Sequence, residues 1–183
     1  MIFGLALSIG ALTLINTVET NTQVVISSIL TFAYSFLIII FVWLRYTKIL
    51  EVIKVETNLE LNLNILLLFL VAVEPYLFNL LHSGTSNLLN FNSAIFGLDL
   101  GLMLVVMGIL YSIAILTHRE MEQETRSTYS YGGNGLFFSG IIILISVLPP
   151  FWGIDVYGIS LRFIMWGAAL LIGPLFRRFK KGK

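Results

Sequence analysis

Long apolar stretches that carry almost no charge are the feature that most constrains how this chain can fold. Of its 183 residues, 57% are hydrophobic and only 11% are charged. A water-soluble domain of this length carries roughly 25% charged residues, and it has too little interior to bury so much apolar surface. The composition therefore predicts an integral membrane protein.

The apolar stretches have the length of membrane-spanning helices. A helix needs about 20 apolar residues to cross about 30 Å of hydrocarbon. Six stretches reach or approach that length: residues 2–18, 24–44, 63–81, 95–116, 136–151 and 156–176. The alternating ten-residue segments typical of a transmembrane barrel are absent from the sequence. We therefore predict an all-α integral membrane protein with six transmembrane helices in a single domain, residues 1–183, that ends in a short basic tail, residues 177–183.

The basic residues predict the orientation of these helices. Ten of the eleven Lys and Arg residues fall in three segments: three in the second loop, two in the fourth and five in the tail. With six spans these segments share one side of the membrane, and the opposite loops carry none. The positive-inside rule then places both termini in the cytoplasm of a cell-membrane protein. The fourth connection, residues 117–134, contains a Gly132-Gly133 pair and is expected to be a solvated loop.

Three charged residues lie within the predicted spans. They are Glu74 in the third, Asp99 in the fourth and Arg162 in the sixth, all in the outer half of the bilayer by this topology. Charges in hydrocarbon need a partner or a path to water. One interpretation is an ion pair or hydrogen-bonded network that ties the helices together, with Glu74 or Asp99 as the partner of Arg162, and another is proton or ion coupling. Pro75 follows Glu74 and leaves a backbone carbonyl in its helix without a donor.

The first span differs from the others because small residues alternate with large apolar ones. Leu5, Ile9 and Leu12 follow helical spacing and share one face. That face also includes Ser8 beside the apolar residues, and Asn16 and Glu19 toward the predicted outer mouth. One interpretation is an ordinary packed helix, since small residues let helices approach closely. The other is an apolar pore constriction, because hydrophobic rings gate by dewetting.

Several functional classes are not favoured by the sequence. The chain has no cysteine, and His82 and His118 have no metal-ligand spacing. No combination of nucleophile and base and no phosphate-binding loop is present, so we expect no enzyme activity, no cofactor and no metal site. The net charge of +1 gives no reason to expect a nucleic-acid partner.

Three segments form a recognisable series. The first span contains the run IFGLALSIGALTLI, the second ends around Trp43 and Lys48, and the third is leucine-rich, introduced by Leu61-Asn62 and interrupted by Pro75. Together these segments resemble the prokaryotic branch of the transmembrane protein 175 family of potassium channels. The Pro149-Pro150 pair and the basic tail also fit. Tyr46 and Thr47 stand where the family usually has two histidines, and the family's Arg and Phe-Ser-Asp signature would come just before Met1.

This resemblance implies a homotetramer of six-span subunits in which the first span of each subunit lines a central pore. By position, the family's apolar constriction falls on Leu5, Ile9 and Leu12, and its Ser/Thr falls on Ser8. An apolar ring strips water from an ion, and potassium sheds water more easily than sodium does. The expected function is a potassium-permeable leak channel. The alternative is a proton-coupled transporter or a non-conducting structural membrane protein of the same fold.

Overall fold

The structure is a computed structural model that describes Gly4, Ser8 and residues 22–51, 57–83, 88–117, 122–156 and 159–169. Four long helices dominate these residues: α2 (Thr22–Leu50), α3 (Asn58–Ser83), α4 (Leu89–Thr117) and α5 (Gln123–Ser146). A short 3₁₀ helix, η1 (Pro149–Phe151), and two strands, β1 (Asp155–Val156) and β2 (Ile159–Ser160), follow. Residues 161–169 are again helical. The prediction of a mostly helical protein is confirmed.

A capping box fixes the start of α3. The backbone N–H of Glu60 donates to Thr57 Oγ1 at 3.2 Å, and the backbone N–H of Thr57 donates to Glu60 Oε2 at 3.0 Å. This reciprocal pair satisfies two donors that the first turn of a helix otherwise leaves without partners. Glu60, which takes part in both bonds, is buried.

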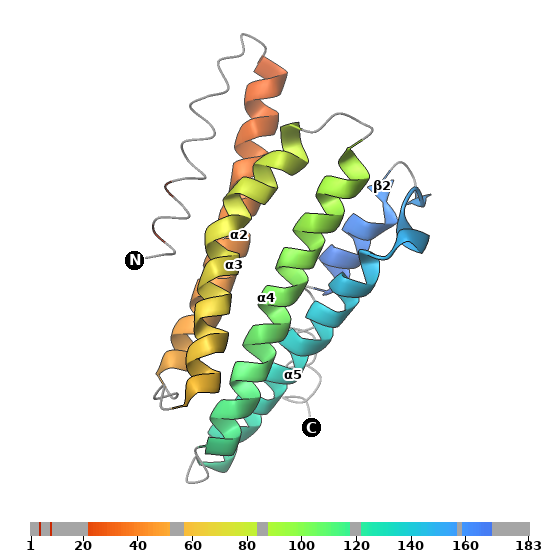
Figure 1. The fold of residues 1–183 in the computed structure, drawn as a ribbon. Coiled ribbons are helices and arrows are strands. Elements are labelled where there is room, and N and C mark those ends of the chain that lie inside the picture. Colours follow the sequence, from red (N-terminus) through yellow and green to blue (C-terminus); the bar gives the residue numbers. More distant parts are fainter. Residues whose placement is uncertain are drawn as a thin grey trace.

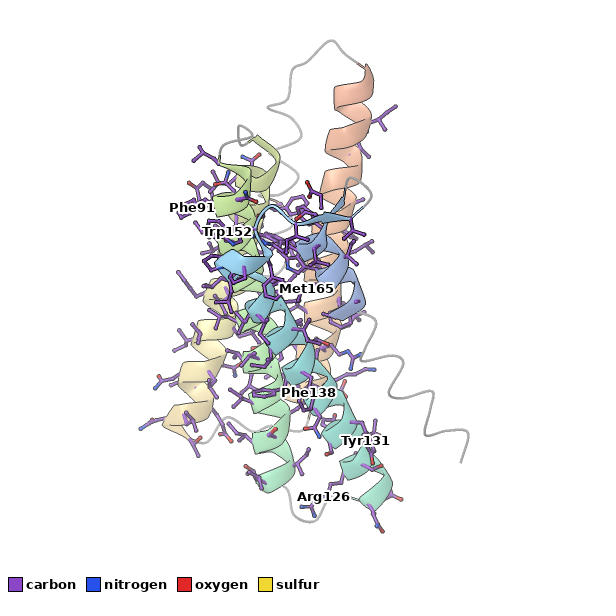
Figure 2. All side chains as sticks on the ribbon, turned by 90° about the vertical axis from the view of Figure 1, so that its right-hand side faces the viewer. Phe91, Arg126, Tyr131, Phe138, Trp152 and Met165 are labelled. Atoms are coloured by element: carbon purple, nitrogen blue, oxygen red, sulfur yellow. The ribbon has the colours of Figure 1, made fainter. Side chains whose placement is uncertain are left out.

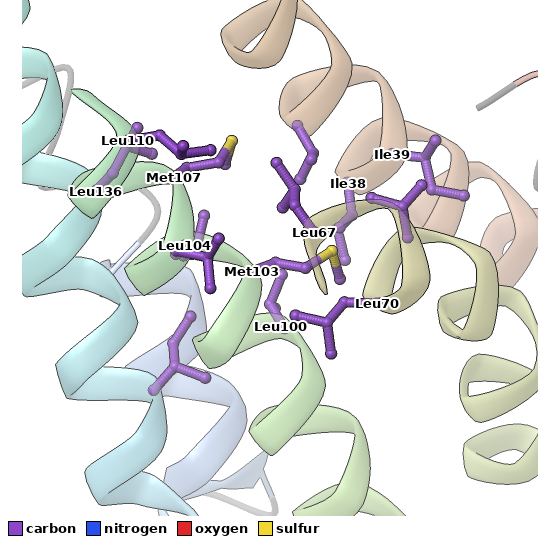
Figure 3. Packing of buried hydrophobic residues seen from close by; sticks show 14 of the residues in the cluster. Ile38, Ile39, Leu67, Leu70, Leu100, Met103, Leu104, Met107, Leu110 and Leu136 are labelled. Carbon is purple, nitrogen blue, oxygen red and sulfur yellow. The ribbon is translucent and has the colours of Figure 1, made fainter. Parts of the chain in front are cut away.

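Helix α4 lies between α3 and α5 (Figure 1) and contributes more of the described core than any other helix. On its side toward α2 and α3, Leu100 and Met103 pack near Leu67, Leu70 and Ile38 (Figure 3). All five side chains are at most 6% exposed. Large flexible side chains such as Met fill irregular gaps, so this side is a conventional side-chain core.

On its other side, α4 meets α5 through glycines. A Cβ built on Gly140 would lie 2.7 Å from the backbone oxygen of Gly101, and one built on Gly108 would lie 3.0 Å from that of Gly133. Gly101 and Gly108 are seven residues apart, as are Gly133 and Gly140. The antiparallel helices therefore touch backbone to backbone at two levels. We call these four residues the glycine ladder. Small residues permit this approach between helices.

The glycine ladder explains why the predicted fourth loop is wrong at its C-terminal end. The Gly132-Gly133 pair suggested a turn, but α5 begins at Gln123 and includes both glycines. A Cβ on Gly133 would lie 2.6 Å from Tyr111 Cβ. The glycine is therefore present for close packing and not for a bend, and this packing offsets its low helix propensity.

A compact turn connects α5 to residues 161–169. Gly153 has a φ of 75°, a conformation that side chains with a Cβ rarely adopt. The turn lies between the predicted fifth and sixth spans. After the turn, β1 and β2 pair antiparallel, with Val156 opposite Ile159. Trp152 and Phe91 lie toward this end of the molecule, and Arg126 lies at the other end (Figure 2).

Two segments of the described residues, Asn58–Leu80 and Asn90–Thr117, are long and apolar enough to cross a membrane. They overlap the predicted third and fourth spans. Helices α2 and α5 overlap the second and fifth. The count of six spans and the cytoplasmic position of both termini stay predictions.

Candidate functional site

Most of the predicted pore face lies outside the described residues. Leu5, Ile9, Leu12, Asn16 and Glu19 are among those positions.

Ser8 is described, and it is helical and exposed. Its hydroxyl donates to the Gly4 carbonyl oxygen at 2.9 Å. Because the hydroxyl proton is donated within the helix, the two lone pairs of the oxygen are left as acceptors. A Cβ on Gly4 would meet nothing within 4 Å. At the two described positions, Gly4 and Ser8, the surface is therefore open and carries an exposed hydroxyl.

The three charged residues of the predicted spans are all buried. Glu74 is 0% exposed on α3, Asp99 is 3% exposed on α4 and Arg162 is 1% exposed in helical residues 161–169. Burial of isolated charge is expensive, so the groups around each side chain decide its role.

The partners of Arg162 are oxygens without formal charge. Its Nε donates to the Ser146 carbonyl at 3.2 Å, and its Nη1 donates to the Asn90 carbonyl at 3.0 Å and to the Ser93 hydroxyl. The guanidinium carbon lies 5.5 Å from the centroid of the Trp152 ring. Neither Glu74 nor Asp99 is among these partners, and the charge network of the three residues stays a prediction.

The arrangement around Arg162 has a clear physical reason. Ser146 is the last residue of α5, and the carbonyls at a helix C-terminus carry partial negative charge that attracts a cation. Asn90 and Ser93 lie in the first turns of α4. One planar, forked cation thus joins the end of α5 to the beginning of α4, and its aromatic neighbour supplies a cation–π contact.

Trp166 extends this cluster into the core. Its indole N–H donates to Ser146 Oγ at 2.9 Å, and Ser146 Oγ donates to the Ile143 carbonyl at 2.6 Å. A Cβ on Gly97 would lie 2.8 Å from the Trp166 ring. We call Asn90, Ser93, Ser146, Trp152, Arg162 and Trp166 the outer cluster.

Asp99 and Arg162 each have one buried side-chain atom without a hydrogen-bond partner among the described residues: Oδ2 of Asp99 and Nη2 of Arg162. The side-chain amide of Asn92 donates to the Leu80 carbonyl at 2.8 Å, which fixes the register of α3 against α4. Asp99 is seven residues after Asn92, and Glu74 is six before Leu80. The two carboxyl-bearing residues are therefore level to within about 2 Å along the helices.

The opposite end of the bundle has its own polar contacts. The Tyr129 hydroxyl donates to the Lys48 carbonyl at 2.8 Å, and the Tyr111 hydroxyl donates to the Arg45 carbonyl at 3.4 Å. The two tyrosine rings lie 5.3 Å apart. Burial, together with the nearby Tyr111 and Glu51, raises the pKa of the Tyr129 hydroxyl above its ordinary value. These tyrosines attach the end of α2 to α4 and α5.

Sequence reasoning missed most of the outer cluster. Asn90, Ser93, Ser146 and Trp152 carry no charge and belong to no recognisable motif. The signal that could have identified them is the position of Ser146 at the end of a helix, where a carbonyl oxygen needs a donor such as the Arg162 guanidinium. Comparisons with known protein families, with curated proteins and with solved structures found no match.

Proposed function

We propose that this chain is a subunit of a potassium-permeable leak channel in a prokaryotic cell membrane, with six spans per subunit and four subunits around a central pore. The first span of each subunit lines that pore. Leu5, Ile9 and Leu12 form the apolar constriction, and Asn16 and Glu19 lie at the outer mouth. Potassium is the permeant ion.

The observation that carries this proposal is the chemistry of Ser8. Its hydroxyl proton is donated to Gly4, so the exposed oxygen offers lone pairs that suit a cation and not an anion. The helical spacing of Leu5, Ile9 and Leu12 puts apolar side chains on the same face. The sequence resemblance adds that this face is the one that lines the pore in the channel family.

The exposed side chains support insertion in a bilayer. On α3 and α4, Leu61, Ile65, Phe69, Phe91 and Leu98 are each between 46% and 61% exposed. Exposed apolar side chains on long helices suit lipid or neighbouring subunits as their surroundings. The described helices α2 to α5 would then support the first span, and the outer cluster would hold the extracellular ends together.

The test is potassium flux from liposomes that contain the purified protein. We expect flux in the wild type, and we expect Ile9→Ala to raise the flux and lower the preference for potassium over sodium, because a smaller ring strips less water. Leu98→Ala, an exposed position on α4, is the matched control and leaves both unchanged. A protein without flux, or one in which Leu5→Ala and Ile9→Ala change nothing, contradicts the proposal. A stable monomer in mild detergent also contradicts it.

A second candidate function is proton-coupled transport on the same fold, or a structural role without conduction. Asp99 favours the coupled mechanism because its buried carboxylate oxygen has no partner among the described residues and lies level with buried Glu74, an arrangement that suits proton transfer. In that case Glu74→Gln and Asp99→Asn abolish a pH-dependent flux. For a leak channel the two variants retain flux through the first-span pore, so the experiment separates the two mechanisms.

A further inference from the structure

The turn between α5 and residues 161–169 exposes an unusual amount of apolar surface for a loop. Leu148, Trp152, Ile154 and Val156 are 51%, 38%, 43% and 38% exposed. Pro149 and Pro150 are exposed as well. The only charged residue between 147 and 156 is Asp155. This segment, residues 147–156, is called the outer turn below.

The backbone of the outer turn is internally satisfied along most of its length. The N–H groups of Val147, Leu148, Phe151 and Trp152 donate to carbonyls of Leu144, Ile145, Leu148 and Pro149 at 2.9 to 3.2 Å. Pro149 and Pro150 have no N–H to satisfy. From residue 147 to residue 152, every backbone N–H is therefore bonded within the protein.

The bonded N–H groups are informative because a loop in water does not require hydrogen bonds within the protein. Water satisfies exposed donors there, whereas each donor without a partner costs several kcal/mol in a membrane. The exposed apolar side chains and the satisfied backbone are separate observations. Both are expected for a segment that lies in apolar surroundings.

Trp152 is held in one orientation within the turn. Its indole N–H donates to the Val147 carbonyl at 2.8 Å, and its ring lies over the guanidinium of Arg162. Tryptophan is enriched where a membrane meets water, because its ring is both apolar and polarisable. The fixed ring gives the turn a rigid apolar surface.

We infer that the outer turn is a membrane anchor, whose apolar side chains insert at the boundary between the headgroups and the acyl chains of a phospholipid bilayer. The turn carries no Lys or Arg, so it fits neutral headgroups such as phosphatidylcholine and not anionic ones. This inference depends on the part of the proposed function that places the chain in a membrane. It does not depend on ion conduction.

The test uses the absence of cysteine from the chain. Three variants are compared in phosphatidylcholine vesicles, each with a nitroxide label on its one introduced cysteine. They are Ile154→Cys in the outer turn, Leu98→Cys at an exposed position of α4, and Gln123→Cys at the start of α5. Collisions with oxygen, which partitions into lipid, and with a water-soluble nickel chelate are then measured. We expect the label at 154 to collide with nickel several-fold less than the label at 123, and to lie at a shallower depth than the label at 98.

Three outcomes overturn the inference, and they can be told apart. A label at 154 that behaves like the label at 123 places the turn in water. A label at 154 that neither reagent reaches, with spin–spin broadening between copies, makes the turn a subunit contact. If the label at 98 is also open to nickel, α4 does not cross the bilayer, and the proposed function itself fails.

A second measurement leaves the turn unaltered. Trp43→Phe leaves Trp152 and Trp166, and Trp166 is only 1% exposed. Quenching by brominated lipids therefore reports on Trp152. We expect strong quenching by lipids brominated near the headgroup and weak quenching by aqueous iodide. The opposite order overturns the inference.

Discussion

The two sides of α4 achieve packing in opposite ways. Toward α5, Gly101 and Gly108 bring the helix backbones into contact with Gly140 and Gly133. Toward α2 and α3, Leu100 and Met103 interlock with other large side chains (Figure 3). Packing on the first side depends on the shape of the backbone, which leaves no room for an added atom. Packing on the second side depends on side-chain volume. Because lipid is as apolar as the side chains, the association of helices in a membrane is stabilised mainly by close van der Waals contact.

The largest expected effect is at Gly140. An added Cβ would lie 2.7 Å from Gly101 O and 2.9 Å from the Val105 backbone N, and backbone atoms cannot move aside as a side chain can. We expect Gly140→Ala to lower the unfolding free energy in mixed micelles by about 3 kcal/mol, and Gly140→Leu to yield no folded protein.

The control for Gly140 is Gly167→Ala, since a Cβ there meets nothing within 4 Å. We expect an intermediate loss of unfolding free energy for Gly101→Ala, because the nearest atoms there belong to the movable side chain of Leu144. Equal effects at Gly140 and Gly167 would show that the ladder is not a close contact.

A smaller effect is expected at the outer end of the same interface. Ser93→Ala removes one acceptor from the buried guanidinium of Arg162, which keeps its bonds to Asn90 and Ser146. We expect a loss of about 2 kcal/mol in unfolding free energy, and Ser93→Thr should retain most of the stability. If Ser93→Ala leaves the unfolding free energy unchanged, the Ser93 hydroxyl contributes nothing to this contact.

The side-chain face should tolerate a change of shape. Met103→Leu keeps the volume and apolar character of a side chain that is 1% exposed. We expect a loss of about 1 kcal/mol or less in the same unfolding assay. Met103→Ala leaves a cavity and should lower the unfolding free energy by more than Met103→Leu does. A large loss for Met103→Leu would mean that both faces of α4 are equally rigid.

The smallest effect concerns the tyrosine contact at the other end. The pKa of Tyr129 is raised in the folded protein, so above about pH 10 the unfolded chain loses this proton while the folded chain keeps it. Its contribution to stability is complete below that pH and declines above it. Tyr129→Phe should lower stability by about 0.5 kcal/mol at neutral pH and weaken the alkaline decline. An unchanged alkaline decline would contradict this role.

The fold class could be predicted from the sequence because helix length and apolar composition are local properties. Helices α2 to α5 overlap predicted spans for that reason. The glycine pair at 132 and 133 was misread because a glycine that permits a turn and one that permits close packing look the same without a partner helix. Its meaning depends on Gly108 and Tyr111, more than 20 residues away.

The candidate site could be predicted only in part. Glu74, Asp99 and Arg162 were identified as buried because charge within an apolar run is visible in the sequence. The partners of Arg162 were not, because a sequence shows charged candidates and conceals backbone carbonyls. The carbonyls of Asn90 and Ser146 reach the guanidinium only through the relative placement of three helices.

The spacing of the glycine ladder also limits how the bundle can move. With rungs seven residues apart, sliding α4 along α5 by one turn would bring Cβ atoms against the backbone of the partner helix. A slide of seven residues, about 10 Å at 1.5 Å per residue, would align only one pair of these glycines again. We therefore expect α4 and α5 to move as one rigid unit, and any relative motion of helices to occur on the other side of α4, where α2 and α3 lie.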